Sequence, residues 1–360
     1  MKTSEQNKSA KMKEITVGNR KIGVGHPVFI IAEMSANHMQ DYDRAVQLIR
    51  AAKKSGADAI KLQTYTADTM TIASDASDFK IKGTLWDGET LYDLYARATT
   101  PWEWYGSLKK VAEQEDIMLF STPFDKTATD FLEKHDVPAY KIASFEAVDI
   151  PLIEYIASKG KPVFISTGIC NEEEIDDAVA ACRRGGNEQI VLLKCTSAYP
   201  APIDEMDLCM IPEMQKRFGT LVGLSDHTMS STGAIVSVAL GACIVEKHMT
   251  LKRSDGGADS GFSLEVEEFQ DMVTAIREAE SALGTASYNL SNKSAEGRVF
   301  CRSLYVISDV KPGDIITESN VRSIRPGYGM APKHFSSIIG KRFTIDVKRG
   351  TPLSFEMLEK

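Results

Sequence analysis

The sequence predicts a (β/α)8 (TIM) barrel with a β-hairpin before it and a small β-rich module after it. From Pro27 onward, eight short apolar runs alternate with amphipathic segments of helical period, which is the element count of such a barrel. A doubly wound open sheet is the competing layout, and its first strand usually leads into a glycine-rich turn. The corresponding stretch here, Ala32–Asn37, contains no glycine. The barrel is therefore the predicted fold.

Residues 1–26 are expected to hold a tail and a hairpin. Met1–Lys13 is polar and lysine-rich with no apolar segment, so we expect a frayed tail and no signal peptide. Ile15–Gly23 alternates apolar and polar residues around Gly18-Asn19, a pattern typical of a β-hairpin. We expect this hairpin to cover the barrel as a lid or plug.

The barrel domain is expected over residues 27–284. Its strands are short and rich in β-branched residues, and its helices carry apolar side chains three or four positions apart. The predicted strands are Val28–Ser35, Ala59–Thr64, Ile117–Thr122, Ala139–Ser144, Pro162–Thr167, Gln189–Thr196, Leu221–Ser225 and Cys243–His248. Among the predicted helices are Asp41–Ser55, Thr127–His135, Asn171–Arg184, Ser230–Leu240 and Glu265–Leu283.

One connection is longer than the regular pattern allows. Tyr65–Trp104 follows the second strand and carries several aromatic residues, including three tryptophans. Because it follows the carboxyl end of a strand, it lies at the rim where barrel active sites form, which makes it a candidate lid or specificity loop. A packed subdomain or a subunit contact is the alternative.

The chain after the barrel divides into a linker and a small domain. Residues 285–301 are expected to form the linker, because this part of the chain is mostly polar. Residues 302–360 contain two apolar strands that end in basic, glycine-containing turns, at Val310–Asp314 and Val347–Pro352. Proline and two glycines present Arg325 on a stiff loop, which we expect to lie over a barrel mouth, either its own or that of a neighbouring subunit.

The composition limits the possible partners and location. Lys+Arg 42 against Asp+Glu 50 gives a net charge of −8, so the surface offers no general basic field for nucleic acid or an anionic membrane. The six cysteines include no CxxC pair, which favours a reducing compartment. No apolar run approaches the length of a membrane span. We therefore expect a cytoplasmic protein.

Two short apolar runs, Leu221–Leu224 and Cys243–Val245, each lead into a polar cluster that ends in a histidine, Ser225-Asp226-His227 and Glu246-Lys247-His248. Two strands joined by a helix are parallel, so both histidines emerge at one rim of the sheet. Neutral imidazoles suit first-row divalent metals such as manganese, iron, cobalt or zinc. The pair therefore predicts a metal site, with two independently satisfied strand-end histidines as the alternative.

Two lysines, Lys61 and Lys141, lie inside apolar strands, where a charged group needs a partner. We expect both to point into the barrel, with small hydroxyl side chains nearby at Thr122, Ser144, Ser166 and Ser225. Such a set suits a phosphate or carboxylate ligand. The alternative is structural ion pairing with Glu33 and Glu146.

Nine ordered motifs resemble the sialic acid synthase family over nearly the whole chain: IAEMSANH, KLQTY, STPFD, YKIAS, ISTG, KCTSAYP, GLSDHT, EKHMT and RPGYG. Members of this family condense phosphoenolpyruvate with an N-acetylated amino sugar on a (β/α)8 barrel that is followed by an antifreeze-like (SAF) domain. The insertion GTLWDGETLYDLYARATTPWEW, with CTSAYPAP and GADSGFS, is most similar to the branch that uses 2,4-diacetamido-2,4,6-trideoxy-L-altrose. Ser197 stands where N-acetylmannosamine-using members place an asparagine that touches the sugar.

The resemblance implies a role for each rim residue. It implies metal binding by His227 and His248, with Mn²⁺ or Mg²⁺ expected and Co²⁺ as a further candidate, and acidic catalysis by Glu33 and Glu146. It implies phosphoenolpyruvate binding by Lys61, Thr122, Lys141, Ser144, Ser166 and Ser225. It implies sugar contacts by Gln63, Ser197, Tyr199, Asp259 and Arg325. The last of these is expected from the partner subunit of a domain-swapped homodimer.

Other functions remain open at this stage. The amino sugar could be that of an N-acetylneuraminate or legionaminate synthase. A different metal-dependent barrel enzyme, such as an aldolase or phosphoesterase, would share the metal site. A catalytically silent sugar-binding or assembly protein would use mainly the C-terminal module.

Overall fold

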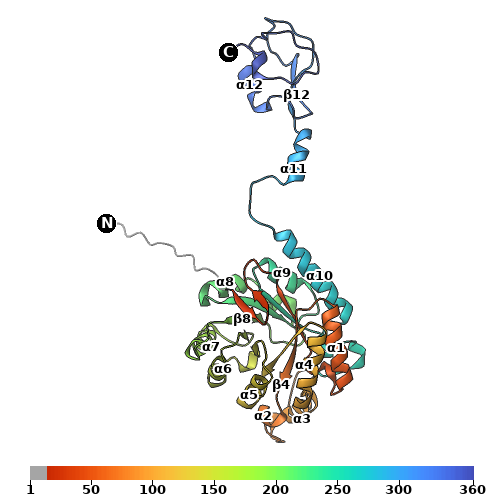
Figure 1. Ribbon diagram of the computed structural model, residues 1–360, viewed down its shortest axis with the longest axis vertical. Helices are drawn as coiled ribbons and strands as arrows, with labels where there is room; N and C mark the ends of the chain where they lie inside the picture. Colours follow the sequence, from red (N-terminus) through yellow and green to blue (C-terminus); the bar gives the residue numbers. More distant parts are fainter. Residues whose placement is uncertain (1–13) are drawn as a thin grey trace, which may run out of the picture. The chain divides into compact units, whose positions relative to one another are not determined.

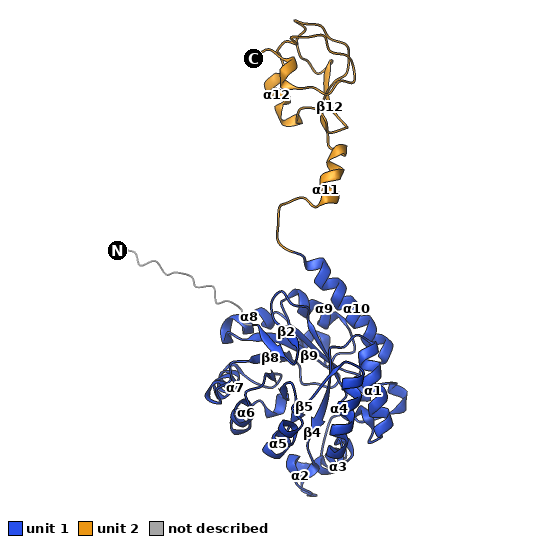
Figure 2. Ribbon diagram, viewed as in Figure 1, with its two compact units in different colours: residues 1–284 blue, residues 285–360 orange. Residues whose placement is uncertain are grey.

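The computed structural model describes residues 14–360, and the predicted tail Met1–Lys13 lies outside them. The chain forms two compact units, residues up to Gly284 and Thr285–Lys360 (Figure 2). The first unit is a closed barrel of eight parallel strands in the order β10-β3-β4-β5-β6-β7-β8-β9 (Figure 1). The predicted (β/α)8 barrel is confirmed. Within the described residues, no helix is long and apolar enough to cross a membrane.

All eight predicted strands are present: β4 has the predicted bounds, β9 is one residue longer, and the others are slightly shorter or shifted. The strands are β3 (Phe29–Glu33), β4 (Ala59–Thr64), β5 (Met118–Pro123), β6 (Tyr140–Ile142), β7 (Val163–Ser166), β8 (Ile190–Cys195), β9 (Leu221–Asp226) and β10 (Ile244–His248). The helices that follow them are α1 (Tyr42–Lys54), α4 (Tyr105–Gln114), α5 (Lys126–Lys134), α6 (Ile150–Ala157), α7 (Glu172–Arg184), α8 (Met210–Phe218), α9 (Thr232–Ala239) and α10 (Val266–Leu283).

Side chains alternate between the two faces of each strand, and this alternation divides the core. One face packs against the helices: Ile30 and Ala32 of β3, for example, lie in the same cluster as Leu48 and Ile49 of α1. The other face points into the barrel, where Phe120 and Phe164 meet edge to face with ring centroids 5.8 Å apart.

The predicted hairpin forms from β1 (Ile15–Val17) and β2 (Arg20–Ile22), which pair antiparallel. Its apolar side chains join the interior cluster that includes Phe29 and Leu221, near the amino ends of the barrel strands. The turn lies at the same end, since a Cβ atom on Gly18 would stand 3.2 Å from the sulfur of Met118. The hairpin therefore plugs the end of the barrel opposite to the strands' carboxyl ends.

The long connection after β4 contains two short helices, α2 (Ala67–Met70) and α3 (Leu91–Ala98). It is anchored at two places. The Trp102 indole N–H donates to the Tyr65 carbonyl at 3.0 Å, and the Trp86 indole N–H donates to the Ala258 carbonyl at 3.0 Å. The second bond ties the insertion to the loop after β10, at the carboxyl rim of the barrel.

The second unit has a hydrophobic core of its own, which includes Leu304, Ile316 and Phe343. Its two strands, β11 (Ser303–Val306) and β12 (Val321–Ile324), pair antiparallel, and a short helix α12 (Phe335–Ile338) packs with them. Backbone bridges join Val310 to Val347 and Tyr305 to Pro352, which matches the β-rich module predicted here. The stretch predicted as linker contains a helix, α11 (Asn292–Glu296).

Candidate active site

Strand alternation places the predicted site residues on the inner face of the barrel. Lys61 lies two positions after Ala59, and Lys141 two positions after Ala139. Both alanines belong to the apolar cluster inside the barrel, so both lysines share its inner face. The same parity holds for the other strand residues of the site, which are Glu33, Gln63, Thr122, Ser166, Ser225, Glu246 and His248. The half of the barrel interior toward the strands' amino ends is therefore apolar, and the half toward their carboxyl ends is polar.

Two lysines and two glutamates form a buried charge cluster in this polar half. Lys61 pairs with Glu33 and lies 3.8 Å from Glu246 Oε2, while Lys141 Nζ lies 3.4 Å from Glu246 Oε1. The Ser225 hydroxyl donates to Glu246 Oε1 at 2.9 Å. The expected inward lysines are present, and the carboxylate beside Lys141 is Glu246 where the ion-pair alternative named Glu146.

Burial and mutual contact set the ionisation of this cluster. Burial lowers the pKa of Lys141, with partial compensation from Glu246. For Lys61 burial also acts downward, but the carboxylates of Glu246 and Glu33 outweigh it and raise the pKa. Burial raises the pKa of Glu33 despite the adjacent Lys61. The cluster thus holds at least one firmly charged ammonium group away from bulk water, where its attraction for an anion is strong.

Hydroxyl groups belong to the same polar half of the barrel, and one of them contacts an ammonium group. Thr122 Oγ1 accepts a hydrogen bond from Lys61 at 3.1 Å, and Ser197 donates to Ser144 at 2.9 Å. The Ser166 hydroxyl is buried and has no hydrogen-bond partner within residues 14–360. Because an unpaired buried hydroxyl is costly, this group is suited to a ligand atom.

Ser144, Cys195 and Ser197 approach the backbone closely at Gly168. A Cβ atom there would stand 2.3 Å from the Ser197 hydroxyl oxygen, 3.0 Å from that of Ser144 and 3.1 Å from the sulfur of Cys195. These three side chains converge on the backbone only because Gly168, the second residue after β7, has no side chain.

His227 and His248 face each other at the mouth of the barrel, with ring centroids 5.3 Å apart. His227 Nδ1 lies 3.0 Å from the Thr196 carbonyl and 3.7 Å from the Cys195 sulfur. A hydrogen bond from Nδ1 to the carbonyl would leave Nε2 as the free nitrogen of that ring. The expectation that both histidines emerge at one rim is confirmed.

The pair meets part of what a divalent ion requires. His248 Nδ1 is buried with no hydrogen-bond partner within the described residues, and burial lowers the His248 pKa well below its usual value. A neutral imidazole with an unused buried nitrogen suits metal coordination. Within residues 14–360, however, no three His, Cys, Asp or Glu side chains converge as a metal site. These residues therefore fit a metal with two protein ligands and further ligands from water or substrate.

Aromatic rings line one side of the mouth next to the histidines. Tyr199 stands 4.5 Å from the His227 ring and 5.0 Å from Phe262, and Phe262 stands 4.9 Å from His248, measured between centroids. Trp86 of the insertion continues this wall, 6.3 Å from Tyr199.

Two other predicted sugar contacts lie near the same mouth. Asp259 accepts hydrogen bonds from the Ser35 hydroxyl and, at 3.1 Å, from the Ala36 N–H. One of its carboxylate oxygens is therefore occupied in holding the turn after β3. Gln63 lies on β4, opposite Thr122 in the strand register and only partly buried.

Glu146 lies in the turn that follows β6. Burial raises its pKa to about 7, and its Oε2 has no hydrogen-bond partner within the described chain. A carboxylate of this kind can take up or release a proton near neutral pH.

Arg325 directly follows β12 in the second unit and is exposed. It is thus the one predicted site residue that belongs to a different compact unit from the barrel.

Sequence reasoning gave no role to Glu246 or to Phe262. Both could have been considered from local pattern. Glu246 stands two residues before His248 and thus on the same inner face, and Phe262 lies within the GADSGFS motif. Their contacts with Lys141 and with the two histidines depend on strand register and loop folding, which no local pattern reveals.

Two family models match the chain in order: the NeuB family over residues 48–288 and the SAF domain over residues 302–359. The pseudaminic acid synthase of Campylobacter jejuni strain 81-176 is 47% identical over 91% of this chain and 95% of its own length. That of Helicobacter pylori strain 26695 is 44% identical, over 93% of this chain and 98% of its own length.

A solved structure shares the fold. The N-acetylneuraminic acid (sialic acid) synthetase of Leptospira borgpetersenii, in complex with citrate, superposes with a TM-score of 0.72 and 30% identity, covering 79% of this chain and 95% of that one. With a barrel model and an SAF model in sequence and 47% identity to a relative of matching length, the chain belongs to the NeuB family.

Proposed function

We propose that this protein is a pseudaminic acid synthase, which condenses phosphoenolpyruvate with 2,4-diacetamido-2,4,6-trideoxy-L-altrose to give pseudaminic acid and phosphate. The observation that carries the proposal is the buried pair Lys61 and Lys141 beside the facing imidazoles, in a chain 47% identical to a pseudaminic acid synthase. Identity to the neuraminic acid synthetase of Leptospira is lower, at 30%.

In the proposed reaction, the methylene carbon of phosphoenolpyruvate forms a bond to the aldehyde carbon of the open-chain sugar, and the aldehyde oxygen becomes a hydroxyl group. Water adds to the former enol carbon and loses a proton. The C–O bond to phosphate then breaks, so that inorganic phosphate leaves and the keto group of the product remains.

The chain's residues supply positioning and proton transfer. Lys61 and Lys141 hold the phosphate and carboxylate groups, and the unpaired Ser166 hydroxyl donates a further hydrogen bond. Glu146 is favoured over Glu33 as the base for water, because Glu146 has an unpartnered oxygen and Glu33 is paired with Lys61.

We propose that His227 and His248 bind a divalent ion, Mn²⁺ or Mg²⁺, with Co²⁺ as a further candidate. The unpartnered His248 Nδ1 supports this assignment. Bound there, the ion would supply Lewis acidity at the aldehyde oxygen. The aromatic wall of Tyr199 and Phe262 would limit the access of water beside it.

We also propose a domain-swapped homodimer in which Arg325 of the partner subunit reaches the acetamido group of the sugar. The independent core of the second unit and the exposure of Arg325 support this arrangement. A cytoplasmic location is part of the same proposal, since all six cysteines are unpaired.

Phosphate release tests the proposed function. Turnover should require both phosphoenolpyruvate and the trideoxy sugar, with the product identified by mass spectrometry. Parallel reactions should contain N-acetylmannosamine and the gluco- and manno-configured diacetamido sugars. Preference for one of these would reassign the sugar while preserving the reaction class, and phosphate release from phosphoenolpyruvate alone would indicate a phosphatase.

A further inference from the structure

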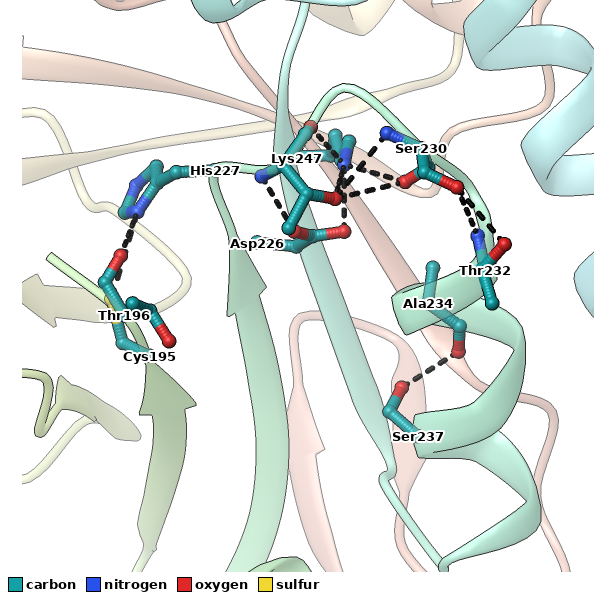
Figure 3. A network of polar contacts seen from close by, with 10 residues as sticks. Cys195, Thr196, Asp226, His227, Ser230, Thr232, Ala234, Ser237 and Lys247 are labelled. Carbon is teal, nitrogen blue, oxygen red and sulfur yellow. Dashed lines mark hydrogen bonds and ion pairs between the residues drawn. The ribbon is translucent and has the colours of Figure 1, made fainter. Parts of the chain in front are cut away.

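An ion pair lies behind the two histidines, on the outer face of the strands that carry them. Lys247 Nζ lies 2.6 Å from Asp226 Oδ2, and both side chains are completely buried (Figure 3). Lys247 also donates to the Thr228 carbonyl at 2.6 Å, to the Thr228 hydroxyl at 3.2 Å and to the Ser230 carbonyl at 3.0 Å. One ammonium group thus binds a strand neighbour and the loop after that strand.

The register of the strands relates this ion pair to the histidines. Lys247 of β10 pairs with Asp226 of β9, and each is followed directly by one histidine, His248 or His227. Because side chains alternate along a strand, the ion pair lies between the strands and helix α9 while the imidazoles face the barrel mouth. The ends of β9 and β10 therefore carry the two imidazoles on the inner face and the ion pair on the outer face.

The ion pair supplies several of the hydrogen bonds that hold the loop after His227. Asp226 Oδ1 accepts the Thr228 N–H at 2.8 Å, and Thr228 Oγ1 lies 3.1 Å from the Ser230 carbonyl. Removal of Lys247 would release two carbonyl groups of this loop from β10. Lys247 therefore helps to fix the His227 backbone relative to His248, together with the Ala201 N–H, which donates to the His227 carbonyl at 3.0 Å.

Fold stability alone does not explain the charges. Neighbouring outer-face positions on the same strands are apolar, at Val222, Leu224 and Val245. Replacing a buried ion pair by apolar side chains of similar volume is often neutral or stabilising. What an apolar pair lacks is the directed bonding that ties the loop carbonyls to the adjacent strand.

We propose that Asp226 and Lys247 are positioning residues that hold His227 and His248 at the separation and orientation that a divalent ion requires. The inference rests on the proposed metal site and concerns residues that do not themselves touch the ion. Groups that hydrogen-bond a metal ligand directly typically change metal affinity by about 10- to 100-fold, and we expect this indirect support to act at the lower end of that range.

The test uses the full-length protein and the double variant Asp226→Asn/Lys247→Met, which removes both charges and nearly conserves volume. Mn²⁺ affinity is measured by electron paramagnetic resonance, phosphoenolpyruvate affinity by calorimetry without metal, and stability by thermal unfolding. The control is Arg277→Met, which removes an ion pair with Asp58 at the opposite end of the barrel. A milder variant, Thr228→Val, removes only the hydroxyl that Lys247 contacts.

The double variant should bind Mn²⁺ about tenfold or more weakly, with phosphoenolpyruvate affinity changed less than about twofold. Its kcat should recover at saturating Mn²⁺. The control should lose stability without losing Mn²⁺ affinity. If the double variant does not fold, Thr228→Val decides, with an expected loss of about threefold or more, because the Thr228 hydroxyl bonds to both Lys247 and Ser230.

Unchanged Mn²⁺ affinity in the folded double variant, or in Thr228→Val where only that variant folds, would overturn the inference. So would an equal loss of affinity in Arg277→Met. Wild-type protein that binds no Mn²⁺ would overturn the metal assignment together with the inference, so the two failures are distinguishable.

Discussion

Glu246 Oε1 lies 3.4 Å from Lys141 Nζ, so a carboxylate stands next to one of the two ammonium groups assigned to the substrate anion. Its second oxygen lies 3.8 Å from Lys61. Glu246 therefore neutralises part of the positive charge that phosphoenolpyruvate would meet.

This geometry predicts an unusual effect for Glu246→Gln. The pocket gains one unit of positive charge, so the phosphoenolpyruvate Kd should fall by about an order of magnitude. Turnover should fall as well, because the lysines lose the partner that orients them. Calorimetry and steady-state kinetics would measure the two effects. Glu154→Gln, which removes a carboxylate paired with Arg184 on the surface, is the charge-matched control. A weaker phosphoenolpyruvate complex would show that Glu246 mainly orders the lysines.

The pH dependence of kcat tests the base. Burial raises the pKa of Glu146 to about 7, and only the ionised carboxylate accepts a proton. The ionised fraction is nearly complete above pH 8 and falls about tenfold per unit well below pH 7. The kcat should fall with pH in the same way. Glu146→Gln should be slow, and its kcat should lack this fall below pH 7. A Glu146→Gln enzyme with the same fall would assign the base to another group.

His248→Ala should abolish Mn²⁺ binding and metal-dependent turnover. It breaks no hydrogen bond to Nδ1, since that atom has no partner among the described residues. The thermal unfolding midpoint should therefore change by only a few degrees, about the effect of 1 kcal/mol in a domain of this size. Retained activity with normal Mn²⁺ dependence would contradict the metal site.

Trp86→Ala should reduce discrimination between sugars. The ring extends the aromatic wall beside Tyr199, and we expect this wall to meet the methyl end of the trideoxy sugar. Exclusion of a hydroxyl group by such a surface is worth about 10- to 100-fold in kcat/KM, and we expect most of it to be lost. Trp102→Ala is the matched control, since Trp102 packs on Phe131 instead. Equal discrimination in wild type and Trp86→Ala would remove the insertion from the specificity assignment.

Arg325→Ala should raise the KM for the sugar and leave phosphoenolpyruvate affinity unchanged. Mixing this variant with His248→Ala tests where the arginine acts. In a swapped dimer, the barrel with an intact His248 receives Arg325 of the partner subunit, so randomly mixed chains should regain about a quarter of wild-type activity. An arginine that acts within its own chain would give no recovery on mixing.

Strand alternation explains how much of the site was predictable. Polar residues inside apolar strands, such as Lys61 and Lys141, are visible in sequence, and the barrel then fixes which face they share. The partnership of Lys141 with Glu246 was not predictable, because it joins strands that are not adjacent in the barrel order. Helix α11 was missed because the composition around it is that of a linker. The Ser144–Ser197 contact depends on a close approach at Gly168 that no periodicity encodes.

The hairpin plug determines where substrates and products enter and leave the barrel. Because Ile15, Val17 and Ile22 fill the amino end of the barrel, substrates and products enter and leave at the carboxyl end. Lys61 and Lys141 lie farther inside the barrel than the aromatic rings around Tyr199, which stand nearer its carboxyl end. In the proposed reaction, phosphoenolpyruvate should therefore bind before the sugar, and the sugar-derived product should leave before phosphate.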